Sequence, residues 1–336
     1  MHTVIGFIRK HLTWLVVAAT GLGLLKGHFA PMEFSRVICA VAAFVMLYPV
    51  MVNFRLEEGF KNLGGVGRVL GISLAVNFVV SPVIAVGLAW VALRSEPLAA
   101  VGLLLIGAVP SSGMAIGWLN QFKANIHLGL VLVAANILAT FLLVPLLMPV
   151  ALEQIFHANV EIGSLVIIEK LAFVILIPLT LGWLTRVVLQ RLGHGGLPAK
   201  HKELLGGVSN LGILLVMFLI MSLKDSQSLL SHPDVALLAV PAVAAYYGLM
   251  YLVVTRVIRH ALTPDEALPF FVTTFLRFHV ISLGITISAF AGLEKGIFAS
   301  VPIIVGFLLQ PALASAIGQR IARQAPPPTT LKPARA

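Results

Sequence analysis

Ten long apolar stretches run through the chain, and they constrain its fold more than any other feature. A helix that crosses the hydrocarbon core of a bilayer needs about 20 mostly apolar residues. Lipid offers no partner to backbone polar groups, so such segments must be helical. We therefore expect an all-α integral membrane protein with ten transmembrane helices at 12–30, 34–54, 69–93, 98–121, 126–151, 165–189, 205–224, 234–258, 267–290 and 296–319.

The composition agrees with a chain that dissolves in a bilayer. Hydrophobic residues make up 59% of it, charged residues 11%, and the mean hydropathy is +1.01, whereas a soluble domain is about half apolar and a quarter charged. The net charge of +10 indicates lysines and arginines gathered on one membrane face, and we expect no nucleic-acid partner. The single cysteine, Cys39, excludes a disulfide framework and a cysteine zinc site; we expect no metal and no cofactor.

The distribution of positive charge tests the number of spans. With both termini cytoplasmic, 16 of the 23 Lys and Arg residues fall in inside segments and 6 in outside segments, and Arg277 lies within a span. Cytoplasmic loops carry such an excess of positive charge. This bias favours ten spans, both termini inside, in the plasma (inner) membrane, over nine or eleven.

One half of the chain echoes the other. Residues 141–147 read Phe-Leu-Leu-Val-Pro-Leu-Leu and residues 307–313 read Phe-Leu-Leu-Gln-Pro-Ala-Leu, an offset of 307 − 141 = 166 positions. The repeats are predicted at 12–160 and 161–320, followed by a disordered tail at 324–336. Five spans per repeat is an odd number, so the second repeat is inverted. Inverted repeats are typical of secondary transporters, which bind their cargo near the bilayer midplane where the repeats meet.

The fourth span contains a helix-breaking sequence at mid-depth, Pro110-Ser111-Ser112-Gly113-Met114. Proline removes a backbone donor and glycine loosens a helix. One interpretation is a discontinuous helix, broken at Pro110 and Gly113, whose free N–H groups face a ligand beside Ser111, Ser112 and Met114. The other is an ordinary proline kink with serines bonded back to the helix.

The corresponding ninth span carries two ionisable residues, Arg277 and His279. Such residues are costly in the membrane and are functional candidates by default. Arginine can hold an oxyanion with two parallel bonds, and histidine can exchange a proton near neutral pH. The alternative is a structural arginine bonded to carbonyls of an unwound helix. The spans hold almost no carboxylates, so a ligand anion, carbonyls or a hydroxyl must serve Arg277.

Three further in-span residues are weaker candidates for cargo contact. Asn77 and Asn136 precede prolines in spans three and five, and an asparagine in such a place more often forms a helix–helix hydrogen bond than a ligand contact. Trp118 shares a helical face with Met114, although tryptophan also marks membrane interfaces.

Together these motifs resemble the arsenite efflux permeases of the bile acid/sodium symporter superfamily. The resemblance spans about residues 12 to 320 and is carried by the order and spacing of five pieces: Met46-Leu47-Tyr48-Pro49-Val50-Met51, Leu74-x-x-Asn77-x-x-x-x-Pro82, Pro110-Ser111-Ser112-Gly113-Met114-x-x-x-Trp118, Asn136, and Ile177-Pro178-Leu179-x-x-Gly182-x-x-x-Arg186. It implies that helices four and nine are broken and cross. It also implies a panel of spans 1, 2, 6 and 7 against a core of spans 3–5 and 8–10.

Two departures from that family concern its site. The permeases have a cysteine after the fourth-span proline, where this chain has Ser111. Their ninth span reads Asn-Phe-Glu, where this chain reads Arg277-Phe278-His279. A thiolate suits arsenite and a hydroxyl does not, whereas Arg277 with His279 suits an anion.

The sequence therefore favours a secondary active transporter of a small organic or oxo-anion, working by alternating access. H⁺ is the favoured coupling ion and Na⁺ is less favoured. The alternatives are an arsenite or antimonite efflux permease with a divergent site and, from another class, a membrane sensor or receptor. An enzyme is not expected, because no third residue orients a Ser111–His279 pair. The oligomeric state is left open between monomer and homodimer.

Overall fold

The computed structural model describes residues 6–8, 11–33, 36–53, 66–110, 115, 118–119, 122–150, 164–223, 232–290 and 296–324. Within these ranges the regular secondary structure is helical, apart from two isolated β-bridges. Four helical segments are long and apolar enough to cross a membrane: Gly67–Ala92, Ile126–Met148, Pro233–Ala261 and Gly296–Gln324. Shorter apolar helices lie at Trp14–Phe29, Pro97–Ala108 and Glu203–Leu219. These features confirm an all-helical integral membrane protein.

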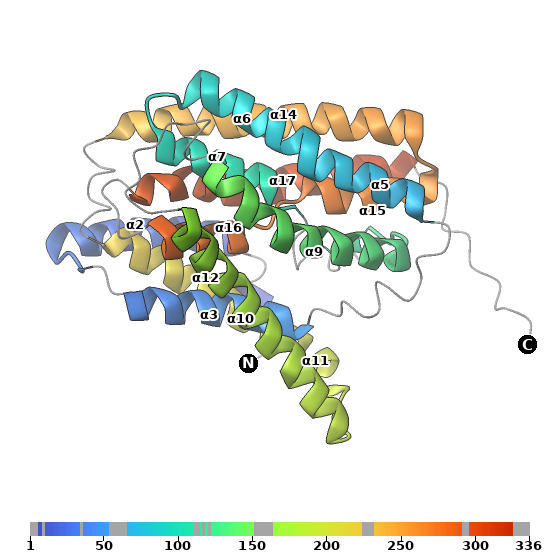
Figure 1. Cartoon of the computed structure of the whole chain (residues 1–336), viewed down its shortest axis with the longest axis horizontal. Coiled ribbons are helices and arrows are strands. Elements are labelled where there is room, and N and C mark those ends of the chain that lie inside the picture. Colours follow the sequence, from blue (N-terminus) through green and yellow to red (C-terminus); the bar gives the residue numbers. More distant parts are fainter. Residues whose placement is uncertain are drawn as a thin grey trace, which may run out of the picture.

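Two groups of helices pack within the molecule. The first group is α2 (Leu12–Phe29), α3 (Arg36–Asn53), α10 (Ser164–Arg191) and α12 (Lys202–Ser222), with the short α11 (Leu197–Lys200) at its edge. The second group is α5 (Gly67–Ala75), η1 (Val76–Val80), α6 (Ser81–Ala92), α7 (Pro97–Ala108), α9 (Ile126–Val150), α14 (Pro233–Ala261), α15 (Pro264–Phe275), α16 (His279–Phe290), η4 (Gly296–Ser300) and α17 (Val301–Gln324). Figure 1 shows α6 and α14 along one side of the molecule and α2, α3 and α12 along the other. The two groups touch where α16 meets α3 and α10, where α9 meets α10, and where α17 meets α2.

Proline sets several helix boundaries. Pro97, Pro233 and Pro264 each occupy the first turn of their helix, where the missing N–H has no intrahelical role. A capping box at Thr263 and Glu266 also fixes the start of α15. Within the third predicted span, the π-helical turn η1 ends at Val80, two residues before Pro82. Because proline cannot donate a backbone bond, the helix widens by one residue there.

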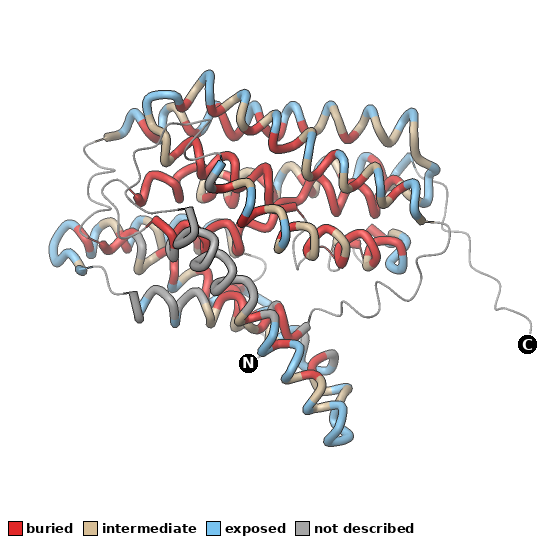
Figure 2. The backbone as a smooth tube through the Cα atoms, viewed as in Figure 1, coloured by how far each residue is buried: buried red, intermediate tan, exposed pale blue. Residues whose placement is uncertain are grey.

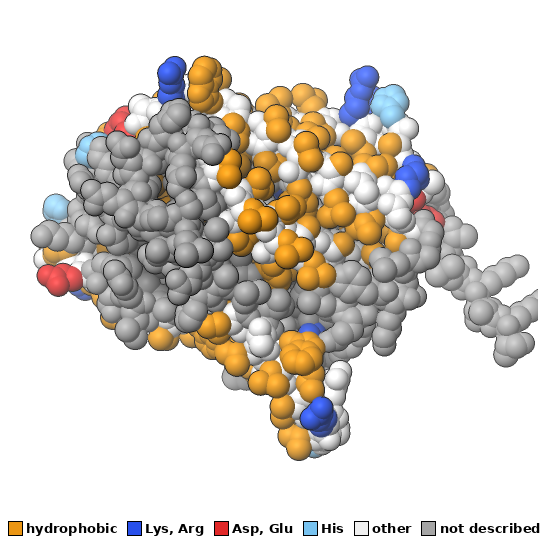
Figure 3. Space-filling view, viewed as in Figure 1, with side chains coloured by type: hydrophobic (Ala, Val, Ile, Leu, Met, Phe, Trp, Pro, Cys, Tyr) orange, Lys and Arg blue, Asp and Glu red, His pale blue; other side chains and the backbone are white. Residues whose placement is uncertain are grey.

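The most deeply buried helices are α7 and α15, which end where the fourth and ninth predicted spans are interrupted. Every residue of α7 from Ala99 to Ala108 and of α15 from Ala267 to Phe275 is buried, and Figure 2 shows this burial in the middle of the molecule. Outer faces carry exposed apolar side chains such as Val83, Trp90 and Leu142. In Figure 3 apolar side chains cover the middle of the visible face, and Lys and Arg lie towards its margins. A face of this kind suits contact with lipid.

Candidate functional site

Two interrupted helices meet at the centre of the molecule. Helix α7 ends at Ala108 and is followed by Val109 and Pro110 in non-helical conformation, and α15 ends at Phe275 and is followed by Leu276 in extended conformation. Pro110 and Arg277 form an antiparallel bridge, and Phe278 donates its N–H to the Val109 carbonyl at 3.0 Å. The interruption predicted near Arg277 and its contact with the Pro110 region are thus observed.

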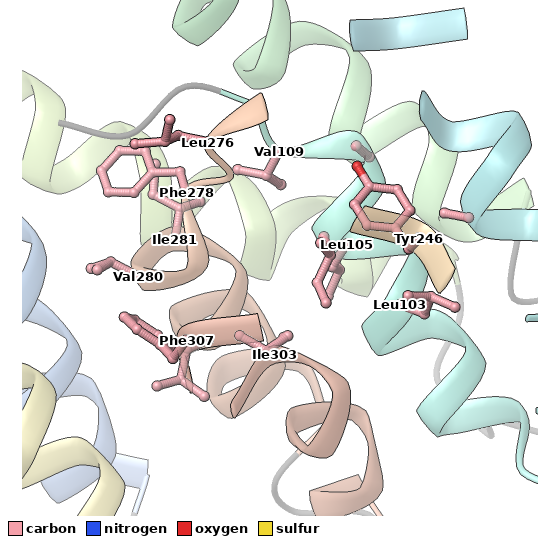
Figure 4. Packing of buried hydrophobic residues seen from close by; sticks show 14 of the residues in the cluster. Leu103, Leu105, Val109, Tyr246, Leu276, Phe278, Val280, Ile281, Ile303 and Phe307 are labelled. Atoms are coloured by element: carbon pink, nitrogen blue, oxygen red, sulfur yellow. The ribbon is translucent and has the colours of Figure 1, made fainter. Parts of the chain in front are cut away.

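The crossing is enclosed by apolar side chains from four helices, α7, α14, α16 and α17. Figure 4 shows Val109, Leu276 and Phe278 at the crossing, with Phe307 of α17 near Val280 and with Tyr246 near Leu105. All of these residues belong to one buried cluster. The polar groups at the crossing are therefore shielded from water in this conformation, and each needs a partner within the protein.

Arg277 is the only charged side chain at the crossing among the described residues, and it is 1% exposed. Its Nη1 donates to the Asn77 side-chain oxygen and to the Gly107 carbonyl, both at 3.3 Å. Its Nη2 lies 3.8 Å from the sulfur of Met250, and its guanidinium carbon lies 5.8 Å from the centroid of the Tyr246 ring. Its Nε has no partner, and no carboxylate from the described residues pairs with it.

Asn77 ties Arg277 into a larger amide cluster. The Asn77 amide nitrogen donates to Asn136 at 3.0 Å and to the Thr273 carbonyl at 3.2 Å. Asn136 donates to the hydroxyl of Ser73 at 3.1 Å. The π turn of η1 places Asn77 between α9 and α15, where it is fully buried. In this conformation Asn77 and Asn136 therefore form a helix–helix hydrogen bond, which is the alternative to contact with the cargo.

A second set of contacts holds the end of α7. Ser81 donates to the Gly107 carbonyl at 2.7 Å, and the hydroxyls of Ser81 and Tyr246 lie 2.7 Å apart. The carbonyl of Gly107 therefore accepts from both Ser81 and Arg277. Carbonyls in the last turn of a helix lack intrahelical donors and carry partial negative charge, so these contacts stabilise the end of α7.

His279 begins α16 and is 2% exposed. Its Nε2 lies 2.9 Å from the Tyr247 hydroxyl, which donates to Gln310 Oε1 at 2.9 Å. Gln310 also accepts the Arg277 backbone N–H at 2.6 Å and donates to the Arg277 carbonyl at 3.2 Å. His279 Nδ1 forms no hydrogen bond within the described structure.

The structure brings together Pro110, Arg277, His279, Asn77 and Asn136. Trp118 is half-buried, and its ring packs at a tilt against that of Phe122, with the ring centroids 5.5 Å apart. Ser111, Ser112, Gly113 and Met114 lie outside the described residues. Sequence reasoning missed the residues Ser73, Ser81, Tyr246, Tyr247, Met250 and Gln310. Of these, Gln310 carried a signal, since it replaces Val144 in the echoed Phe-Leu-Leu sequence.

The fold and this buried polar centre define a class of protein. Apolar membrane helices that are interrupted at mid-length and meet around polar groups are the architecture of secondary transporters. A model of the sodium bile acid symporter family matches residues 40–230, more than half of the chain, and the chain belongs to this family. The resemblance drawn from the motifs is thereby confirmed, and the chain is a membrane transporter.

Two relatives extend the comparison beyond the matched region. The arsenical-resistance protein Acr3 of Corynebacterium glutamicum is 24% identical over 272 residues, which cover 74% of this chain and 71% of the relative. The protein of the same name from Alkaliphilus metalliredigens is 25% identical over 334 residues, covering 91% of this chain and 90% of the relative. The similarity to the second relative therefore spans nearly the full length of both proteins.

Proposed function

We propose that the chain transports a small organic or oxo-anion by secondary active transport with alternating access. The observation that carries this proposal is the buried guanidinium of Arg277, which has no carboxylate partner among the described residues. A buried charge without a counter-charge costs several kcal/mol. The Gly107 carbonyl and the Asn77 oxygen offer dipoles and no net charge. An anionic cargo would supply the missing negative charge.

The first turn of α16 is the proposed place for the anion. The free N–H groups of a helix N-terminus attract anions, and α16 begins at His279, directly beside the crossing. We further propose Ser111, Ser112 and Met114 as contacts from the chain that follows Pro110, with Asn77, Asn136 and Trp118 as secondary contributors. The guanidinium of Arg277 contacts α7, η1 and α14 in this conformation. It would act on the anion through its field, which is weakly screened in the protein interior.

The packing of the helices supports a moving-panel mechanism. The helices α2, α3, α10 and α12 would form the panel, and the remaining helices would form the core that carries the crossing. Helix α16 packs against both α3 and α10, so the proposed anion position lies near the boundary between the groups. Sliding the core along this boundary would open the position to each side in turn. In this proposal His279 carries the coupling proton.

The proposed setting follows from the charge distribution. The chain would lie in the inner membrane with both termini cytoplasmic, as a monomer or a homodimer.

The two repeats at 12–160 and 161–320 would be inverted relative to each other. The bridge between Pro110 and Arg277, which lie 277 − 110 = 167 positions apart, supports this arrangement, since the offset of the sequence echo is 166.

An alternative cargo is arsenite or antimonite. The names of the two relatives favour it. Against it, the only cysteine, Cys39, lies in α3 and outside the crossing helices. Soft thiolate ligands suit trivalent arsenic, whereas hydroxyls and a guanidinium do not.

A ligand screen on purified protein separates these two cargoes. A compound that binds the folded state raises its apparent thermal stability. We expect carboxylates, sulfonates or phosphonates to raise the melting temperature of the wild-type protein, and we expect no shift with arsenite. Loss of the shift in Arg277→Gln would support the anion site, whereas a shift with arsenite alone would favour the alternative.

A further inference from the structure

Gln310 pairs with the backbone of Arg277 on the side of the chain opposite to the crossing. Its side-chain amide accepts the Arg277 N–H at 2.6 Å and donates to the Arg277 carbonyl at 3.2 Å. Residue 277 lies between α15 and α16, where neither helix supplies a partner for these groups. An unpaired backbone group at this depth costs free energy comparable to a lost hydrogen bond. The amide of Gln310 therefore replaces the helical bonds that the break removes.

The first repeat has no such glutamine, and the chemistry of proline explains why. The sequence echo aligns Gln310 with Val144, and the bridge pairs Arg277 with Pro110. Proline has no backbone N–H, so the break at Pro110 leaves one donor fewer to satisfy. Arg277, like any residue other than proline, brings that backbone donor back. Gln310 is thus the partner that a non-proline residue at the second break requires.

Gln310 also determines the proton position on His279. Because its nitrogen donates to the Arg277 carbonyl, its oxygen is the acceptor for both Arg277 N–H and the Tyr247 hydroxyl. Tyr247 has one proton, which it gives to Gln310, so its oxygen accepts from His279 Nε2 at 2.9 Å. The hydrogen of the neutral imidazole is then on Nε2. Nδ1, which has no partner in the described structure, keeps a free lone pair.

We propose that Gln310 is a positioning residue for transport, which holds the Arg277 backbone and, through Tyr247, keeps His279 in the Nε2–H tautomer. This inference rests on the proposed function for its transport readout. Nδ1 is then the atom that takes up the coupling proton. Among the described residues, the titratable or charged groups around the imidazole are Tyr247 from α14, with Tyr246 beside it, and Arg277 on its own segment. Helix α17 contributes Gln310 and Phe307.

The test compares three substitutions. Gln310→Met removes both bonds to Arg277 at similar volume. Tyr247→Phe cuts only the link between Gln310 and His279. Gln319→Met is the matched control, because Gln319 is an exposed glutamine on the same helix. Uptake of the anion found in the ligand screen is measured in proteoliposomes as maximal rate and half-saturating concentration across pH.

The expected results differ between the variants. Gln310→Met should lower the maximal rate at least about tenfold, because it removes two buried hydrogen bonds to the Arg277 backbone. Tyr247→Phe should leave the half-saturating concentration within about twofold and change the pH profile, because the tautomer of His279 is no longer set. Gln319→Met should match the wild type. Equal transport in Gln310→Met and Gln319→Met would overturn the proposal.

A second readout needs no transport activity. In protein labelled with ¹⁵N-histidine, the His279 signals are those absent from His279→Gln, and their shifts distinguish the two tautomers. We expect Nε2–H in the wild type and a loss of that preference in Tyr247→Phe. An Nδ1–H tautomer in the wild type, or an unchanged signal in Tyr247→Phe, would contradict the inference even if the cargo is not an anion. If Gln310→Met does not fold, Tyr247→Phe decides, since it removes one hydroxyl.

Discussion

Val109 and Phe278 are joined by a backbone hydrogen bond of 3.0 Å between residues 278 − 109 = 169 positions apart. This bond links the end of α7 to the segment between α15 and α16. Each helix break leaves backbone groups without a helical partner. At the crossing, each break supplies hydrogen-bond partners for some of the backbone groups of the other. The crossing is therefore a single structural unit, and changes on either helix should act on both.

A first prediction concerns the last turn of α7. A Cβ added at Gly107 would lie 2.7 Å from the Cβ of Ala85, so Gly107→Ala should push α7 away from α6. The shift moves the carbonyl that accepts from Ser81 and Arg277. We expect a stability loss of about 1–3 kcal/mol, measured as a lowered melting temperature in detergent. Gly87→Ala on α6 is the control, because a Cβ there meets no atom within 4 Å, and equal melting temperatures would refute the packing argument.

A second prediction adds a counter-charge to Arg277. The Asn77 side-chain oxygen accepts from Arg277 at 3.3 Å, so Asn77→Asp places a carboxylate beside the guanidinium. If the uncompensated charge attracts the cargo, affinity for the anion should fall by about tenfold or more. Asn136→Asp serves as the comparison, since Asn136 contacts Asn77 and Ser73. The idea fails if Asn77→Asp binds the anion as tightly as the wild type.

A third prediction concerns His279 and the glycine beside it. His279→Gln should leave binding largely intact and flatten the pH dependence of uptake between about pH 5.5 and 8.5, because the group that exchanges the proton is gone. Gly306→Ala should also disturb the pH profile, since its Cβ would lie 2.6 Å from Cε1 of the imidazole. Gly248→Ala, with no atom within 4 Å of its Cβ, is the control. An unchanged profile in both His279→Gln and Gly306→Ala would reduce His279 to a structural residue.

A fourth prediction concerns arsenite. The wild-type chain should confer little resistance on an arsenite-sensitive host, and Ser111→Cys alone should not produce robust resistance. The reason is that a thiolate suits trivalent arsenic and that the ninth span presents Arg277 and His279 in place of a carboxylate. Growth in graded arsenite is the measurement, with a cysteine-bearing permease as the positive control. If the wild type protected the host as well as that control does, arsenite rather than an anion would be the cargo.

The helix positions could be predicted from the sequence because apolar length decides them. The predicted segments at 126–151 and 234–258 correspond to Ile126–Val150 and Pro233–Ala261. Proline and glycine at 110 and 113 indicated one break, and Arg277 with His279 indicated the other. Ten spans in two inverted repeats remain a prediction, since the described residues contain four helices that are both long and apolar enough to cross a membrane.

The partners at the crossing could not be predicted in the same way. Gln310 and Arg277 are 33 positions apart, and Ser81 and Tyr246 are 165 apart. A glutamine or tyrosine in an apolar helix has no periodicity that indicates its partner. Asn77 and Asn136 were recognised as candidates, but only the π turn before Pro82 explains why Asn77 reaches Asn136, Thr273 and Arg277 at once.

Uptake of labelled anions into proteoliposomes, compared between the wild type, Arg277→Lys and Arg277→Gln, tests the central claim most directly. We expect saturable anion uptake by the wild type. Arg277→Lys should bind more weakly because lysine keeps the charge but cannot replace the guanidinium contacts with Asn77 and Gly107 that hold this charge in place, and Arg277→Gln should lose uptake. Arsenite should not be carried by any of the three. Arsenite transport by the wild type without uptake of any anion, or anion affinity that is unchanged in Arg277→Gln, would contradict the account.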